Sequence, residues 1–441
     1  MNSNATLWTW SITVAVAGFL FGFDTAVISG ADLPIQALWD RGPLFHGLFV
    51  MSSALWGTVV GALFGNVPCD RFGRRPTLIA IGLLYLLSAA GSALAPDPYT
   101  FSVMRFIGGA GVGVSSIAVP AYIAEVAPAE SRGRLVALYQ FQIVFGILVA
   151  YFSNFALDAM LGLDWRWMLG VEAVPATVFL LMVSRVPESP RWLLLHGNRE
   201  AEARAVIEKV NPGNVDSVVQ AVRDSALAEP TGRLFDPRYR TPVVLAFLIA
   251  FFNQMSGINF VIYFAPRIFD LAGLDTSAAL LSTTGIGVTN LVFTLLGVVL
   301  IDRAGRRFLM TVGSVGYIVA LTGVAWSFAS DASGLVVVLF LFLFIAAHAI
   351  GQGAVIWVFI AEVFPNRVRS KGQSLGCGTH WVLAASIALL MPAALQAFSG
   401  TVIFGFFAAM MLLQLVFVRT WMPETRGRTL EDLSADLVQP D

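Results

Sequence analysis

Long apolar segments alternate with short polar connections along this chain. An apolar α-helix needs about 20 residues to cross a bilayer, and the segments reach or exceed that length, which lets several of them cross at a tilt. The pattern therefore predicts an all-α membrane protein. We expect twelve transmembrane helices, at 7–29, 44–67, 76–95, 100–127, 134–158, 167–186, 240–270, 278–301, 308–329, 334–363, 371–397 and 400–419.

Composition and charge agree with this fold class. The chain of 441 residues is 57% hydrophobic and 12% charged, with a mean hydropathy of +0.76, whereas a soluble domain has about 25% charged residues. The net charge of −1 gives no reason to expect a nucleic acid partner. Cys69 and Cys377 lie far apart and in no metal-ligand pattern, so we expect neither a disulfide nor a bound metal.

Basic residues gather on alternate connections. One side holds nearly all of the 27 Lys and Arg residues, and the connections on the other side hold Arg41, Arg166 and Arg267. Positively charged connections stay in the cytoplasm, so we expect both termini there. The N-terminus lacks the basic segment and cleavage motif of a signal peptide, and we expect the first helix to remain in the mature protein.

Three motifs occur twice, in the same order and with nearly the same spacing. They are DRFGRR at 70–75 and DRAGRR at 302–307, IAEVAP at 123–128 and IAEVFP at 360–365, and PES at 187–189 and PET at 423–425. The repetition predicts two six-helix halves in the same orientation, 1–186 and 240–421. Carriers built from such halves hold their substrate near the midplane between them.

The two halves are joined by a polar interval, 187–239. It contains a helix-like polar segment at 199–209, so we expect a cytoplasmic linker with short helices. The residues from 422 to 441 form a short cytoplasmic tail.

Asp24 is the only ionisable side chain between residues 7 and 29, and Arg105 is the only basic residue elsewhere at membrane depth. Insertion scales put the cost of a charged side chain at the centre of a membrane helix at about 2.5–3.5 kcal/mol, so such residues usually face a partner charge or an aqueous cavity. We interpret the two as a buried acid–base pair in which Asp24 loads and unloads a proton. The alternative is a fixed structural salt bridge.

The repeated arginine-rich loops can form ion pairs at the cytoplasmic helix ends. Their glycines permit tight turns, and their arginines can bond the acids of the second repeated motif or helix-end carbonyls. We call this set the cytoplasmic latch, because it would hold the halves together on that side; anchoring by charge alone also applies. Its residues are Asp70, Arg71, Arg74, Arg75, Glu125, Arg132, Asp302, Arg303, Arg306, Arg307, Glu362 and Arg369.

Further motifs are RGR at 132–134, PESPRW at 187–192, QMSGIN at 254–259 and PETRG at 423–427. With the repeated motifs, they make the chain resemble the sugar porter family of the major facilitator superfamily over essentially its whole length. The resemblance implies twelve helices, alternating access and one central monosaccharide site. It also implies proton coupling, because Asp24 and Arg105 match the pair of proton-coupled members, and it indicates a symporter of the bacterial inner-membrane type.

Polar and aromatic side chains in the apolar segments suit a sugar. Amides donate and accept hydrogen bonds as sugar hydroxyls do, and aromatic rings fit the apolar faces of a pyranose. Ser256 and Gly257 lie where the seventh span is expected to bend at membrane depth. Each amide can instead bond a neighbouring helix, and each Trp can pack in the core or at the interface. The candidate substrate site comprises Gln140, Asn253, Gln254, Asn259, Asn290, Trp357, His380 and Trp381.

Several positions depart from the family pattern. Asn253 stands where well-known hexose and pentose porters have a second Gln, Ile147 where relatives often have Gln, and His380 where some have Gln. His348 is a further polar residue, at a position where fructose carriers of the family can have His. Either His can donate to a sugar hydroxyl or bond a neighbouring helix. These differences leave the identity of the sugar open.

The sequence therefore predicts a monomeric importer of a monosaccharide, such as glucose, fructose, xylose or galactose, with the proton as coupling ion and no other cofactor. The nearest alternative is a facilitative uniporter or a polyol or inositol porter, and a different class is a non-transporting sugar sensor. The sequence has no nucleophile–base pair, metal cluster or phosphate loop, so we do not expect an enzyme.

Overall fold

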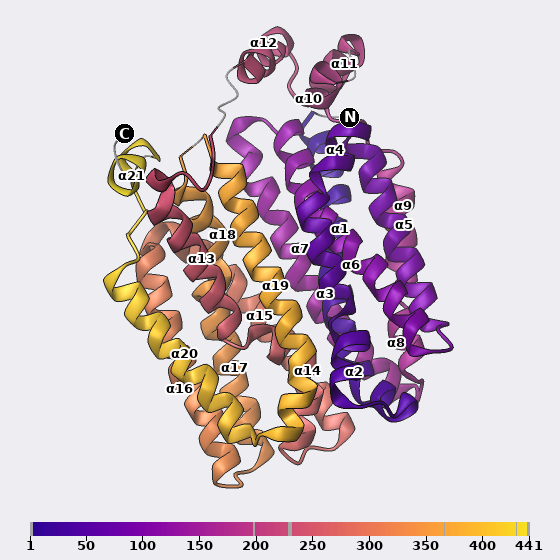
Figure 1. Ribbon diagram of the computed structural model, residues 1–441. Helices are drawn as coiled ribbons and strands as arrows, with labels where there is room; N and C mark the ends of the chain where they lie inside the picture. Colours follow the sequence, from indigo (N-terminus) through magenta and orange to yellow (C-terminus); the bar gives the residue numbers. More distant parts are fainter. Residues whose placement is uncertain (1–2, 197–198, 228–231, 366, 429, 439–441) are drawn as a thin grey trace. The chain divides into compact units, whose positions relative to one another are not determined.

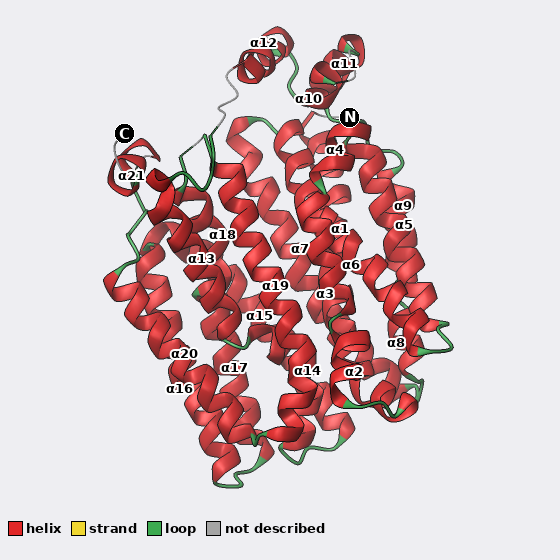
Figure 2. Cartoon of the chain, in the orientation of Figure 1, coloured by secondary structure: helices red, strands yellow, loops and turns green. Residues whose placement is uncertain are grey.

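The structure is a computed structural model that describes residues 3–196, 199–227, 232–365, 367–428 and 430–438. Every regular element within these residues is a helix, as the sequence predicts (Figure 2). Within the described residues, eleven helices are long and apolar enough to cross a membrane, or up to 12 when the bent pair Pro43–Met51 and Ser53–Phe64 is taken as one span. The predicted all-α transmembrane fold is confirmed.

The chain divides into two compact units. The first consists of Met1–Val27, Ser53–Ala150 and Leu163–Glu229, and the second of Ile28–Ser52, Tyr151–Gly162 and Pro230–Asp441. Two helices contribute to both units: α1, Ser3–Trp39, and α7, Ala129–Phe155.

The first unit is built around α6, Pro98–Val126, which packs along α3, Ser53–Phe64, and α5, Arg74–Ala93 (Figure 1). A Cβ added at Gly57 or Gly109 would meet the backbone of the facing helix, so these glycines let α3 and α6 approach closely. The other helices of this unit are α4 (Asn66–Phe72), α8 (Trp165–Gly170), α9 (Ala173–Val183), α10 (Pro190–Leu195), α11 (Glu200–Val210) and α12 (Val215–Leu227).

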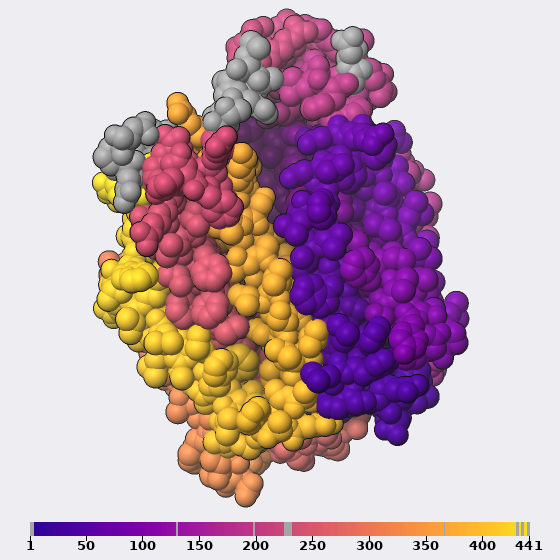
Figure 3. Space-filling view, in the orientation of Figure 1, coloured from indigo at the N-terminus to yellow at the C-terminus, as the bar shows by residue number. Residues whose placement is uncertain are grey.

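The second unit contains most of the remaining helices. On the face shown in Figure 3, α13 (Arg240–Met255) and α19 (Arg369–Ala397) lie side by side at the surface, in rose and orange. The other elements are α2 (Pro43–His46), η1 (Gly47–Met51), η2 (Ala156–Met160), η3 (Pro237–Tyr239), α14 (Ile258–Leu271), α15 (Thr276–Ala304), α16 (Arg306–Ala329), α17 (Gly334–Ile350), α18 (Gln352–Val363), α20 (Gly400–Thr420) and α21 (Leu430–Leu437).

Two spans of the second unit are broken at glycines. The seventh span changes from α13 to α14 at Gly257, whose φ of +83° is a left-handed conformation that glycine adopts without strain. This break confirms the bend expected at Ser256 and Gly257. The tenth span changes from α17 to α18 at Gly351, and the sequence analysis did not predict that second break.

The expected end of the first span at residue 29 is wrong. The helix α1 continues through Pro34 to Trp39. Asp32, which lies beyond the expected end, is buried and bonded in the structure. A buried carboxylate is tolerated in an apolar helix when it is bonded to a partner, whereas an unpaired one is costly, so the helix can continue past Asp32.

Candidate functional site

Asp24 on α1 and Arg105 on α6 are bonded to each other inside the first unit. Arg105 Nη1 donates to Asp24 Oδ1 at 2.5 Å, and Nη2 donates to the Asp24 carbonyl oxygen at 3.0 Å. Both side chains are 2% exposed. Gly108, one turn past Arg105, leaves room beside the pair, since a Cβ there would meet Ser88.

Glu172 is a second buried carboxyl close to this pair, and the sequence analysis missed it. It immediately precedes α9, is 1% exposed, and interacts electrostatically with Asp24 and Arg105. Its Oε1 has no hydrogen-bond partner among the described residues. The signal that selected Asp24, an acid inside an apolar segment, was also present at Glu172 and could have identified it.

Three hydroxyls extend this polar interior. Ser115 Oγ lies 3.4 Å from Tyr85 Oη and 3.2 Å from Tyr139 Oη. Tyr85 is also within electrostatic reach of Asp24. Gln140 follows Tyr139 on α7 and is half-buried in the first unit. The first unit thus holds one of the predicted substrate residues beside a chain of polar groups.

In the second unit, Gln254 joins amides on both sides of the break in the seventh span. Its Nε2 donates to Asn253 Oδ1 at 3.0 Å, and its Oε1 accepts from Asn259 Nδ2 at 2.9 Å. Gln254 is fully buried, and Asn253 and Asn259 are 2% and 8% exposed. The break at Gly257 therefore brings polar groups of α13 and α14 together.

The same amide reaches an aromatic group on neighbouring helices. Gln254 Nε2 lies 3.1 Å from Nδ1 of His380 on α19. The ring centroid of His380 lies 5.1 Å from that of Trp357 on α18 and 4.8 Å from that of Trp381. Since an amide nitrogen only donates, one ring nitrogen of His380 accepts here and the other remains able to donate.

The remaining polar candidates are placed differently. Asn290 on α15 is 7% exposed and accepts from Thr294 at 3.3 Å, and no hydrogen bond of the described residues joins it to Gln254. His348 on α17 lies 2.5 Å from the Tyr317 hydroxyl and is close enough to His380 to affect it electrostatically. Six of the eight candidate substrate residues thus form one group, which excludes Asn290 and Gln140.

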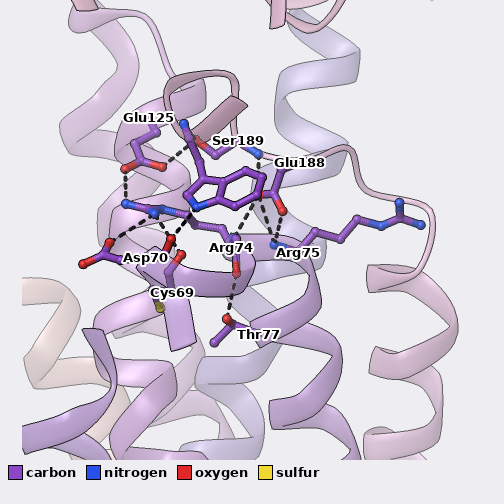
Figure 4. A network of polar contacts seen from close by, with 10 residues as sticks. Cys69, Asp70, Arg74, Arg75, Thr77, Glu125, Glu188 and Ser189 are labelled. Atoms are coloured by element: carbon purple, nitrogen blue, oxygen red, sulfur yellow. Dashed lines mark hydrogen bonds and ion pairs between the residues drawn. The ribbon is translucent and has the colours of Figure 1, made fainter. Parts of the chain in front are cut away.

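The first arginine-rich loop forms a network at the ends of α4, α5 and α6 (Figure 4). Arg74 donates to Glu125 at 2.8 Å, to Asp70 at 3.3 Å and to the Cys69 carbonyl oxygen at 3.0 Å. Arg74 is 12% exposed, so its charge is largely shielded from water. The loop that precedes it turns at Gly73, whose φ of +99° favours glycine.

The second arginine-rich loop repeats these contacts in the second unit. Arg306 donates to Glu362 at 2.9 Å, to Asp302 at 3.3 Å and to the Ile301 carbonyl oxygen at 3.0 Å. The turn at Gly305 has a φ of +91°. The bonds of each arginine lie within one unit.

A third repeated acid completes each network. The Glu188 carboxylate accepts from the backbone N–H groups of Arg74 and Arg75 at 2.9 to 3.2 Å, and Glu424 accepts from those of the second loop at 2.9 and 3.0 Å. The neighbouring hydroxyls of Ser189 and Thr425 donate to the acids of the second repeated motif at 2.5 and 2.6 Å. The PES and PET repeats carried the signal for these residues.

The pKa values of Glu188 and Glu424 are shifted in opposite directions. Burial raises the pKa of Glu188, more than its backbone hydrogen bonds lower it. Burial also acts on Glu424, but there the bonds from four backbone N–H groups dominate and lower the pKa. Both glutamates lie in the connections beyond the membrane-spanning helices.

The other predicted members of the cytoplasmic latch bond backbone groups or lie at the surface. Arg75 donates to the Ser184 carbonyl oxygen at 2.5 Å, Arg307 to that of Val418 at 3.0 Å, and Arg369 to that of Phe364 at 3.3 Å. The exposed members are Arg71, which lies over the Phe72 ring, Arg132 and Arg303.

Comparison with known proteins gives a match to the family described as "Sugar (and other) transporter" over residues 10–437. The arabinose-proton symporter of Bacillus subtilis (strain 168) is 35% identical over 434 residues, which cover 96% of this chain and 93% of the relative. The D-xylose-proton symporter of Escherichia coli (strain K12) is 33% identical over 466 residues, with 96% and 94% covered.

Solved structures give the same result. The inward open conformation of the xylose transporter XylE from E. coli has a TM-score of 0.87 and 31% identity, and the match covers 98% of this chain and 100% of that one. A partially occluded inward open conformation of the same transporter has a TM-score of 0.86.

Proposed function

Because this chain belongs to the sugar transporter family of the major facilitator superfamily, we propose that it imports a monosaccharide together with a proton by alternating access. The observation that carries the proposal of coupling is the buried pair of Asp24 and Arg105. Relatives named as symporters of arabinose and xylose support it.

Asp24 would be the group that binds the coupling proton. Arg105 keeps its charge at any relevant pH, so it stabilises the ionised form of Asp24. Protonation of Asp24 removes this attraction and leaves the buried guanidinium to the second carboxyl, Glu172. The site formed by Asp24, Glu172 and Arg105 has no net charge when one of its two carboxyls is protonated. A buried site without net charge is less costly than a charged one. A change of partner by Arg105 would then accompany the conformational change.

The six candidate residues that form one group in the second unit would bind the sugar. They are Asn253, Gln254, Asn259, Trp357, His380 and Trp381. The Oδ1 atom of Asn259 would accept from a sugar hydroxyl, and the remaining ring nitrogen of His380 would donate to one. Trp357, which is 39% exposed, would offer an apolar ring face. Gln254 is fully buried and would hold its neighbours in position. Gln140 and Asn290 would reach the sugar from other helices.

The two halves, 1–186 and 240–421, would be the moving parts, with both termini and the linker 187–239 in the cytoplasm of a bacterial cell. In another state, residues of the cytoplasmic latch would bond across the two halves and hold the cytoplasmic side closed. Each arginine network ties the helix ends within a unit, which would let that unit move as one body.

Uptake into proteoliposomes tests the proposal. The purified protein is given labelled D-xylose, L-arabinose, D-glucose, D-fructose, D-galactose or inositol, with and without an imposed pH difference, and empty liposomes are the control. We expect one or a few sugars to accumulate above their external concentration only with the pH difference. Uptake that never exceeds equilibrium would instead indicate a uniporter, and binding without uptake would indicate a sensor.

A further inference from the structure

A second buried ion pair lies at the far end of α1. Asp32 Oδ2 accepts from Arg267 Nε on α14 at 2.7 Å, and Asp32 Oδ1 accepts from Arg267 Nη2 at 2.9 Å. His46 Nε2 on α2 is 2.7 Å from the same Oδ1. Gln36, one turn along α1, also accepts from Arg267. We call Asp32, Gln36, His46 and Arg267 the Asp32 cluster.

The Asp32 cluster is buried and contains an acidic and a basic side chain. The side chains of His46 and Asp32 are 3% and 1% exposed, and that of Arg267 is 8% exposed. Arg267 is always charged, and its two-pronged bond requires an ionised carboxylate. Because that carboxylate only accepts, the facing nitrogen of His46 carries a hydrogen. Asp32 and Arg267 carry opposite charges and bond each other, which is the condition for burying an ion pair at low cost.

The members of the cluster come from segments that are far apart in the chain. Asp32 and His46 lie in Ile28–Ser52, which comprises the end of the first span and the start of the second and belongs to the second unit. Arg267 lies near the end of the seventh span, in the other predicted half. The cluster therefore bonds segments of both predicted halves within one compact unit.

The cluster lies at the opposite end of the second unit from the Arg306 network. After Arg267 and the end of α14, the helix α15 runs from Thr276 to Ala304, and the turn of the second arginine-rich loop at Gly305 follows it. In Figure 1, α2 and α21 are at opposite ends of this unit. The positive-inside rule assigns the arginine-rich end to the cytoplasm, so it assigns the Asp32 cluster to the outside.

Two further contacts hold the same segments. Gly47, next to His46, packs so closely on α19 that a Cβ there would meet the backbone of Leu389. Tyr151, in the segment Tyr151–Gly162 of the second unit, donates to the Ile262 carbonyl oxygen on α14 at 2.8 Å. The ends of three spans of the first predicted half are thus attached to the second unit at this side.

We propose that the Asp32 cluster is an outer latch: an ion pair that must open before sugar can enter from the outside. The proposal rests on the proposed function, since only alternating access requires these segments to separate. Opening would expose Asp32 and Arg267 to water, which solvates both charges. The strength of the cluster would therefore set the fraction of molecules that are open to the outside.

Labelling of an introduced cysteine measures this opening. Ile35 lies on α1, next to the cluster, and is fully buried. In a protein whose free Cys69 and Cys377 are replaced by Ser, Ile35→Cys would react with a membrane-impermeant maleimide only when the outer side opens. Leu44→Cys, at a position that is 55% exposed, is the matched control for access and reagent. The measured quantity is the ratio of the two labelling rates.

Breaking the ion pair should raise this ratio. Asp32→Asn leaves Arg267 buried without its counter-charge, so we expect an increase of at least about tenfold. Arg267→Lys keeps the charge but loses the two-pronged bond, and a smaller increase is expected. Asp32→Glu, which keeps a carboxylate, should stay closer to the parent protein. If Asp32→Asn does not fold, Arg267→Lys and Asp32→Glu still test the order of the effects.

An unchanged ratio in the folded Asp32→Asn and Arg267→Lys proteins would overturn the outer latch. This result would leave the proposed function intact if the parent protein still accumulates sugar in proteoliposomes. Conversely, increased labelling in a protein that transports no sugar would support the latch and remove the transport proposal. The two outcomes are distinguishable because labelling needs no sugar.

Discussion

Tyr151 Oη donates a hydrogen bond of 2.8 Å to the carbonyl oxygen of Ile262. In a continuous helix that carbonyl would accept from the residue four positions later, which is Pro266 and has no N–H. The tyrosine therefore supplies the donor that the proline removes. Phe264, between the two, has a φ of −120° outside the helical range, so α14 is bent at this point.

Replacing Tyr151 with Phe should destabilise the protein, because it leaves the buried Ile262 carbonyl without a donor. We expect a loss of about 1–3 kcal/mol, measured as a lower melting temperature in detergent. The control is the same substitution together with Pro266→Ala, which restores a backbone N–H four residues after Ile262. If the loss is as large in the double variant, the missing hydrogen bond is not its cause.

Replacing Asp24 with Asn should separate two transport activities. Asn has the same size as Asp but cannot ionise, so it mimics the protonated state permanently. Binding of sugar and counterflow of labelled against unlabelled sugar should survive, since neither releases a proton. Accumulation driven by an imposed pH difference should be lost. A variant that still accumulates sugar in response to that difference would place the coupling group elsewhere.

Replacing Gln254 with Ala should weaken sugar binding. The change removes the group that holds Asn253, Asn259 and His380, and it leaves buried polar partners unpaired. The expected cost is about 1–3 kcal/mol, or roughly ten- to a hundredfold in affinity. Gln414→Ala is the control, because Gln414 is a buried amide of the same unit that bonds Gln352 and Ser314 instead. Equal sugar affinity in the parent and Gln254→Ala proteins would remove Gln254 from the site.

Glu188 and Glu424 should affect stability with opposite pH dependence. The raised pKa of Glu188 contributes stability that is present below about pH 4.5 and is lost as pH rises. The lowered pKa of Glu424 contributes stability that is present above about pH 4.5 and is lost as pH falls. Melting temperatures of Glu188→Gln and Glu424→Gln across this range measure both effects. The difference in melting temperature between the parent protein and Glu188→Gln should shrink with rising pH, and the difference between the parent protein and Glu424→Gln should grow. The same pH dependence of both differences would contradict the assignment.

Reporter fusions test the orientation. The positive-inside rule predicts that a tag after Asp441 and a tag inserted within 205–225 are both cytoplasmic. A reporter that is active only in the cytoplasm should therefore work at both places. Activity of a periplasmic reporter at either one would reverse the orientation and would move the Asp32 cluster to the inner side.

The sequence predicted the helical fold and the bend at Gly257, because length, hydropathy and glycine act locally. It also pointed to the residues of both arginine networks, since the repeats mark equivalent positions. Glu172 was missed, although it is also an acid within a predicted apolar span, because only Asp24 was singled out for this reason.

Contacts between distant segments were not predictable in the same way. Asp32 lies beyond the expected end of the first span, and Arg267 was assigned to a connection. Nothing in either local sequence indicates its partner. Only packing brings residues 32, 46 and 267 together. The break at Gly351 was also missed, although a glycine on each side of Gln352 gave a local signal for it.

The break at Gly257 has a consequence for which molecules cross the membrane and which only occupy the site. Gln254 lies before the break and Asn259 after it, and the hydrogen bond of 2.9 Å between them fixes the angle between α13 and α14. A ligand hydroxyl that took over the bond to Asn259 would release this angle. Exchange of a bond at the hinge, rather than affinity, would then separate a transported sugar from a competitive inhibitor, and a tightly bound analogue that left the bond in place would block the carrier instead of passing through it.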